Sequence, residues 1–138
     1  MDLITKLQSK KIKVEEIAGW GPYLRKQWEA AFASHLSDAN KKKIYMDQYL
    51  WHAFSYEKVT CATNDEAAEL FNAQQKKSCY VFYQHSDDVL LIDRASKITA
   101  SDISLEDDIY IVDKDFTWTY VKTHESYCGP YFHKLEKK

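Results

Sequence analysis

Four short runs of β-branched and aromatic residues in the second half of the chain constrain the fold most strongly. Cys79–Tyr83 and Val89–Ile92 flank one polar turn, and Ile109–Val112 and Thr117–Val121 flank a second. Runs of this composition on either side of a polar turn are typical of β-hairpins. Because successive hairpins pair most simply with their neighbours, we expect an antiparallel meander of these four strands. The unbroken apolar runs of the first hairpin indicate central strands that are covered on at least one face.

The first half of the chain shows the three- and four-residue spacing of helices instead. Leu24, Trp28 and Phe32 form an apolar stripe after Gly21-Pro22, a sequence that suits the start of a helix. Other segments carry weaker signals of helix caps or of alternation. The expected elements are a short helix over residues 1–9, a short or edge strand over 11–17, and helices that begin near Tyr23, Ser37 and Asn64.

Together these patterns predict an α+β fold in a single domain over residues 1–138. The helical half covers about 1–75 and the sheet half about 76–133. We expect the N-terminal helices to pack on one face of a four- or five-stranded antiparallel sheet. Hydrophobic residues make up 45% and charged residues 29% of the chain, which is the composition of a folded globular protein and not of a disordered one.

The sheet half is strongly acidic. Residues 86–115 carry nine carboxylates against Arg94, Lys97 and Lys114, a net charge of −6, whereas the whole chain carries −2. Each acidic group taken singly also suits a turn, where Asp bonds to the local backbone. If folding brings the groups together, they form an acidic surface. The nine residues are Asp87, Asp88, Asp93, Asp102, Glu106, Asp107, Asp108, Asp113 and Asp115.

A second candidate site lies near the C-terminus, where His124, Glu125, Cys128 and His133 fall within ten residues. A catalytic cysteine needs a base within reach and a group that orients the base, and these residue types are present. On a strand, however, His124 and Glu125 would point to opposite faces. His124, Cys128 and His133, with Cys79 or His85, are also permissive for zinc, but the paired spacing of structural zinc sites is incomplete.

Other classes of protein find little support. No run approaches the ~20 apolar residues of a membrane span, and the first ten residues lack the features of a secretion signal. Three separated cysteines suit a reducing compartment, so we expect a cytoplasmic protein. The lysine run Lys41–Lys43 is a weak nucleic-acid signal in a slightly acidic chain, so we do not favour nucleic acid as the partner. Glycine-rich nucleotide loops and common hydrolase motifs are absent, so we expect no cofactor and favour a non-enzymatic role, with an enzyme left open.

Two segments resemble known families. The stretch Asp108–Glu125, with its strand, Asp-x-Asp-Phe-x-Trp turn and second strand ending in Thr-His-Glu, resembles bacterial immunity proteins that neutralise toxins. The wider chain, from Trp28 through Tyr83–Ser86 to Cys128–Phe132, resembles an uncharacterised family, a domain of unknown function, from bacilli and relatives. The first resemblance implies a small inhibitor of a toxin. Neither resemblance assigns a role to a particular residue.

Charge and resemblance together favour a non-enzymatic protein-binding module, of the immunity or antitoxin type, with an acidic and aromatic face for a basic toxin or nuclease. Acidic side chains would speed the encounter and aromatic anchors would supply the short-range energy. Alternatives are a small enzyme or metal-binding protein built on His124, Glu125 and Cys128, and a binder of nucleic acid or a small ligand. The predicted partner-binding residues are Glu106, Asp107, Asp108, Tyr110, Asp113, Asp115, Trp118 and Tyr120.

Overall fold

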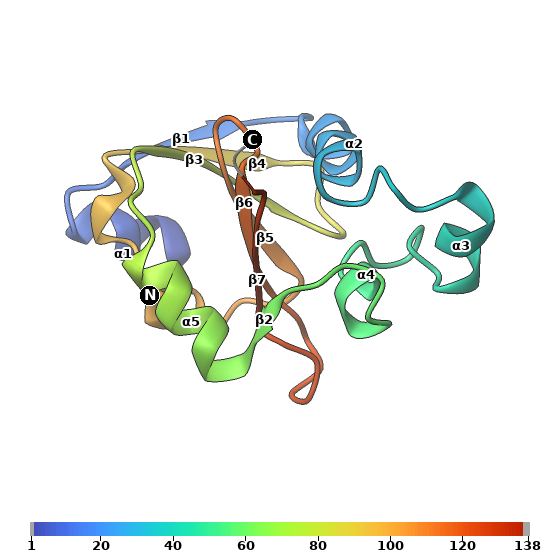
Figure 1. The fold of residues 1–138 in the computed structure, drawn as a ribbon. Helices are drawn as coiled ribbons and strands as arrows, with labels where there is room; N and C mark the ends of the chain where they lie inside the picture. Colours follow the sequence, from blue (N-terminus) through green and yellow to red (C-terminus); the bar gives the residue numbers. More distant parts are fainter. Residues whose placement is uncertain (1, 137–138) are drawn as a thin grey trace.

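One antiparallel sheet organises the protein. The computed structural model describes residues 2–136 and contains seven strands within them (Figure 1). The predicted hairpins are confirmed, and the predicted edge strand lies at one border of the sheet. In spatial order the strands are β1 (Lys13–Ile17), β4 (Val89–Asp93), β3 (Ser78–Tyr83), β5 (Ile109–Asp113), β6 (Trp118–Lys122), β7 (Tyr131–Lys134) and β2 (Ala62–Thr63).

The α+β class is confirmed, but the predicted count of four or five strands and the predicted meander are wrong. Strand β5 pairs with β3 and not with β4. The reason is that the other edge of β4 is already occupied by β1, so the next hairpin can join only on the β3 side. The prediction missed β2 and β7, which pair with each other beyond β6.

Helices cover both faces of the sheet, not the one face that the sequence predicted (Figure 1). Alternation along β5 gives the physical reason. Ile109 and Ile111 belong to one core cluster, Tyr110 and Val112 to the other, and all four side chains are fully buried. One face carries α1 (Leu3–Ser9), α5 (Asn64–Ala73) and the 3₁₀ turns η1 (Ala95–Lys97) and η2 (Ala100–Ile103); the other carries α2 (Gly21–Phe32) and α4 (His52–Ser55). Helix α3 (Asp38–Lys43) contributes no buried residue to either cluster.

Long-range contacts fix the helices on the sheet. On the α2 face, Trp28 is fully buried and donates its Nε1–H to Thr119 Oγ1 at 2.9 Å. On the opposite face, the ring of Phe71 in α5 stacks on Tyr120 with centroids 4.3 Å apart. None of the helices within residues 2–136 is both long and apolar enough to traverse a bilayer.

Helix α2 is held directly against the β3–β4 turn. The Gly21 N–H donates to the Asp87 carbonyl at 2.8 Å, and a Cβ at position 21 would lie 2.7 Å from the Asp87 Cα. Only glycine permits this approach. Arg25 then donates to the carbonyls of Tyr83 and Ser86 at 3.1 and 2.8 Å. This end of the sheet is therefore rigidly supported from the α2 face.

Candidate functional site

The three aromatic residues predicted as partner anchors lie in the core. Tyr110, Trp118 and Tyr120 are each at most 2% exposed. The Tyr110 hydroxyl donates to Gln84 Oε1 at 2.5 Å and accepts from the backbone N–H of Trp51 at 3.1 Å. Because both faces of the sheet are covered, side chains that alternate along β5 and β6 are buried whichever way they point. These rings stabilise the fold and offer no contact area to a partner.

The predicted acidic residues divide between the two ends of β5. Glu106, Asp107 and Asp108 precede the strand, whereas Asp113 ends it and Asp115 follows. Four strand residues, 109–112, lie between the groups, and the five residue steps from Asp108 to Asp113 span about 16 Å. The single acidic face expected from the sequence is therefore not formed. Basic side chains also contact four of the nine carboxylates: Arg25 contacts Asp87, Lys10 contacts Asp102, Lys122 contacts Asp107 and His124 contacts Asp108.

Asp108 is buried and makes long-range hydrogen bonds. Its carboxylate accepts from Trp51 Nε1 at 2.9 Å, from the His124 backbone at 3.2 Å and from His124 Nδ1 at 2.9 Å. The hydrogen bond to Asp108 raises the pKa of His124. The other ring nitrogen of His124 lies 3.2 Å from Glu125 Oε1. The cationic form of His124 is therefore held between two carboxylates.

This geometry does not assemble the catalytic group that the sequence allowed. His124 and Cys128 line the same depression of about 270 Å³, but the ring nitrogens of His124 face Asp108 and Glu125. His133 contacts the Thr60 carbonyl at 2.6 Å through Nδ1. Within residues 2–136, no three His, Cys, Asp or Glu side chains are arranged to hold a metal ion. The other cysteines are poor nucleophiles, because burial raises the pKa of Cys61 to about 11 and that of Cys79 to about 12.

An acidic pocket lies where β1, the β3–β4 turn and the start of α1 meet. Its volume is about 290 Å³. Ten of the described residues line it; four of them carry carboxylates, and none of the ten is Lys, Arg or His. The carboxylates belong to Asp2, Glu16, Asp88 and Glu106, and the remaining lining residues are Leu3, Ile4, Tyr83, Ser86, Val89 and Leu90. We call this set the acidic pocket.

Two of these carboxylates are held in place by the fold. Asp2 caps α1, accepting from the Thr5 N–H at 2.8 Å, and this hydrogen bond lowers the pKa of its carboxyl group. Glu106 accepts from the Tyr83 hydroxyl, whose pKa is raised by burial and by that carboxylate. Glu16 and Asp88 are exposed. Within residues 2–136, none of the four carboxylates forms an ion pair, so the described lining residues carry a formal charge of −4.

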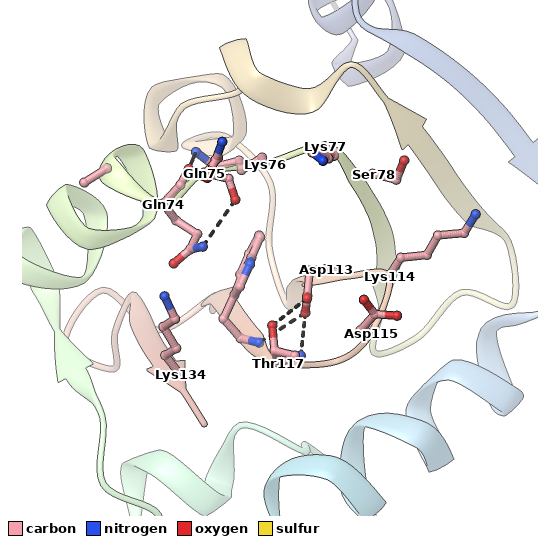
Figure 2. Close-up of a pocket in the computed structure, with 12 residues that line it drawn as sticks. Gln74, Gln75, Lys76, Lys77, Ser78, Asp113, Lys114, Asp115, Thr117 and Lys134 are labelled. Carbon is pink, nitrogen blue, oxygen red and sulfur yellow. Dashed lines mark hydrogen bonds between the residues drawn. The ribbon is translucent and has the colours of Figure 1, made fainter. Parts of the chain in front are cut away.

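A second pocket lies at the opposite end of β3 and β5 and has a volume of about 830 Å³ (Figure 2). Four lysines and two aspartates are among its lining residues. Asp113 closes the β5–β6 turn, since it accepts from Thr117 N and Thr117 Oγ1 at 2.5 Å and from Trp118 N at 3.2 Å. The residues of this lysine pocket are Ala73, Gln74, Gln75, Lys76, Lys77, Ser78, Asp113, Lys114, Asp115, Thr117, Trp118 and Lys134.

Lys76 is the unusual member of the lysine pocket, because it is only 4% exposed. Its ammonium group donates to the Gln74 carbonyl at 3.0 Å and lies 4.6 Å from the centroid of the Phe71 ring. Burial lowers the pKa of this group. Among residues 2–136, no carboxylate lies within 4.0 Å of it.

Sequence reasoning missed most of the residues that line the two pockets. Asp88 and Glu106 stood out in the acidic count, but Asp2 and Glu16 lie more than seventy residues away in an unremarkable N-terminal segment. The pairing of β1 with β4 brings Glu16 to this end of the sheet. Lys76 lies between a helix and a strand, where lysine is ordinarily exposed, and no local pattern marks it as buried.

Comparison with known proteins identifies a family but no function. A family model described as Domain of unknown function (DUF4275) matches residues 1–132. No curated protein and no solved structure matches the chain. Because the family model covers nearly the whole sequence, the chain belongs to this family, in agreement with the predicted membership of an uncharacterised family.

Proposed function

We propose that this member of the DUF4275 family is a non-enzymatic binding protein whose acidic pocket receives a lysine or arginine side chain of a basic protein partner. The observation that carries the proposal is the composition of the pocket within residues 2–136: four carboxylates, no basic lining residue and an apolar lining of Leu3, Ile4, Val89 and Leu90. This is a revision of the hypothesis from the sequence, because it keeps Glu106 and the basic partner and drops the buried aromatic anchors.

The chemistry of the pocket suits a long cationic side chain. Lysine and arginine bury an aliphatic stem along apolar surface and keep the charged group in a polar environment. Leu3 and Leu90 are at most 8% exposed and form part of the apolar lining, whereas Glu16 and Asp88 are exposed. A volume of about 290 Å³ is at the lower limit of pockets that hold drug-sized ligands, so one side chain is an appropriate occupant.

The surroundings of the pocket also favour a protein partner. Leu105, next to Glu106 in the chain, is 79% exposed and offers apolar contact beside the pocket. An unpaired charge of −4 attracts a basic surface over several ångströms and repels acidic ones, which raises the association rate and adds specificity. A charged pocket beside a single apolar side chain is smaller than a stable protein interface. The neighbouring surface must therefore supply the rest of the contact area with the partner.

An immunity or antitoxin role is the narrower form of this proposal. It is supported by the resemblance of Asp108–Glu125 to immunity proteins and by the basic character expected of a toxin that binds nucleic acid. The test is rescue of growth: the wild-type chain protects cells that express a toxin encoded beside it, and the variant E16Q/D88N/E106Q protects less. If the variant protects cells as well as the wild type does, rescue does not depend on the acidic pocket.

Binding of a basic probe tests the pocket itself. Anisotropy of a fluorescent hexalysine peptide is measured with the wild-type chain, with E16Q/D88N/E106Q and with E15Q, at two salt concentrations. Glu15 is the matched control, because it is an exposed carboxylate on the same strand but points to the other face of the sheet. We expect the triple variant to weaken binding by roughly tenfold, about 1.4 kcal/mol, and E15Q to change it little. Equal losses in both would show unspecific attraction and overturn the proposal.

A further inference from the structure

We propose that the lysine pocket binds an oxyanion, a phosphate or carboxylate group of a small organic molecule, with Lys76 as its buried cation. The pocket lies at the end of β3 and β5 opposite to the acidic pocket, so the proposal is independent of the proposed protein partner. It begins from a cavity of about 830 Å³ that has a charged and almost completely buried side chain in its wall (Figure 2).

The first step concerns the incomplete set of partners around Lys76. An ammonium group has three N–H donors. One donates to the Gln74 carbonyl, and the Phe71 ring lies beneath the group. Among residues 2–136, no carboxylate compensates the charge within 4.0 Å. A buried charge without a counter-ion lowers the stability of the folded protein, and binding of an anion would give a reason for the buried position of Lys76.

The second step concerns the sign of the rest of the pocket. Lys77, Lys114 and Lys134 are exposed at its border. Asp113 is engaged by Thr117 and the Trp118 backbone, which leaves Asp115 as the only other acidic lining residue. Four lysines against two aspartates give the pocket a formal charge of +2. An anion that enters therefore meets several cations, of which Lys76 is the one withdrawn from water.

The third step concerns the size of the ligand. The pocket falls within the range of about 300–1,000 Å³ that is usual for small-molecule sites and is much larger than a bare ion requires. Gln74 and Gln75 add amide groups to the same wall. The expected ligand is therefore an organic molecule that carries the oxyanion, and phosphate and carboxylate share the chemistry that lysine recognises.

The experiment follows the ε-methylene signal of Lys76 by NMR in protein labelled at lysine, during separate titrations with inorganic phosphate and with citrate. We expect a saturable shift of the Lys76 signal with at least one probe at up to about 10 mM, ten times a dissociation constant of about 1 mM. Bound anion favours the ammonium form, so the pKa of Lys76 rises on binding. Saturation by phosphate alone indicates a phosphate-bearing ligand, and saturation by citrate alone indicates a carboxylate; either supports the proposal.

Two variants complete the test. K76M removes the buried charge and with it the Lys76 signal, so the titrations of the variants follow the signal of Lys77 at the pocket border. We expect K76M to weaken binding at least tenfold, whereas K97M, at an exposed lysine of the turn η1, leaves it unchanged. K114Q/K134Q changes only border residues and gives a second measurement if K76M does not fold; we expect a loss of several-fold. The proposal is overturned if neither probe moves the Lys76 signal, or if the variants that fold bind as tightly as the wild type.

Discussion

Strand β5 begins after Glu106-Asp107-Asp108 and ends in Asp113-Lys114-Asp115, and these similar acidic sequences have different environments. Asp108 is 8% exposed and binds Trp51 and His124, residues distant in the sequence. Asp113 is half-buried and accepts from residues four and five positions later. One carboxylate therefore joins separate parts of the fold, and the other shapes a turn.

The difference extends to the pockets at the two ends. At the Asp108 end, carboxylates without basic partners define a small pocket, and the basic residues nearby are occupied elsewhere. At the Asp113 end, lysines outnumber carboxylates around a larger pocket. Local sequence composition is acidic at both ends, so the sign of each surface is decided by residues that the fold brings from other segments. The net charge of residues 86–115 is therefore a poor guide to either surface.

Substitution of the two aspartates should give the largest contrast. We expect D108A to lower the free energy of unfolding by about 3 kcal/mol, because it leaves the indole N–H of the buried Trp51 without an acceptor and removes the contact to His124. D113A should cost about 1 kcal/mol, since water can replace the bonds of a turn. Urea unfolding measures both.

The variant D108N serves as a control for the first prediction. Asparagine keeps an acceptor for Trp51 and tolerates the left-handed backbone at this position, where φ is 51°. We expect D108N to have a free energy of unfolding between that of D108A and that of the wild type. Equal costs for D108A and D113A would contradict the distinction between a long-range and a local carboxylate.

This contrast also shows how far the sequence could predict the structure. The hairpins over 79–92 and 109–121 were predictable, because β-branched and aromatic runs beside polar turns are local signals. The Asp113 turn was predictable for the same reason. The pairing of β1 with β4 and the second helical layer were not, because they depend on contacts between segments distant in the sequence; the paired residues of β1 and β4 are 72 to 80 positions apart. The acidic pocket depends on that pairing through Glu16.

Substitution of Arg25 should have the next largest effect on stability. It tests whether this side chain supports the β3–β4 turn beside the acidic pocket. Its guanidinium group contacts two carbonyls of the β3–β4 turn and Asp87 at 3.0 Å. We expect R25A to lower the free energy of unfolding by about 2 kcal/mol, because hydrogen bonds from a charged donor are lost. K26A, at the next and exposed position of α2, should stay within ~0.5 kcal/mol of the wild type. Similar costs in the two variants would show that the turn holds its shape without Arg25.

Substitution of Lys76, at the opposite end of the sheet, should raise the free energy of unfolding instead of lowering it. K76M removes a buried charge that has no ion-pair partner among the described residues and replaces it with an apolar side chain of similar length. Replacement of a buried charge in this way is often stabilising. We expect a gain of about 1 kcal/mol in urea unfolding, with K77M at the exposed neighbour as the control. A clear loss of stability in K76M alone would assign the ammonium group a structural role.

The smallest expected effect is a pH dependence whose sign differs between the two ends. The folded-state pKa of His124 is raised, so its contribution to stability is complete below the unfolded pKa and is lost as pH rises through the folded pKa. Because about a third of the side chain is exposed, solvent screens the pair, and we expect ~0.5 kcal/mol.

Urea unfolding near pH 6 and pH 8 isolates the His124 contribution when the wild type is compared with H124Q, in which the fall with pH should shrink. Lys76 acts the other way. Its folded-state pKa is lowered, so the folded protein releases this proton first and stability rises as pH approaches the ordinary lysine range. This alkaline rise should be absent from K76M. If His124 titrates identically in the wild type and in D108N, the Asp108 carboxylate does not hold the imidazolium, and the contrast between the two ends is confined to their pockets.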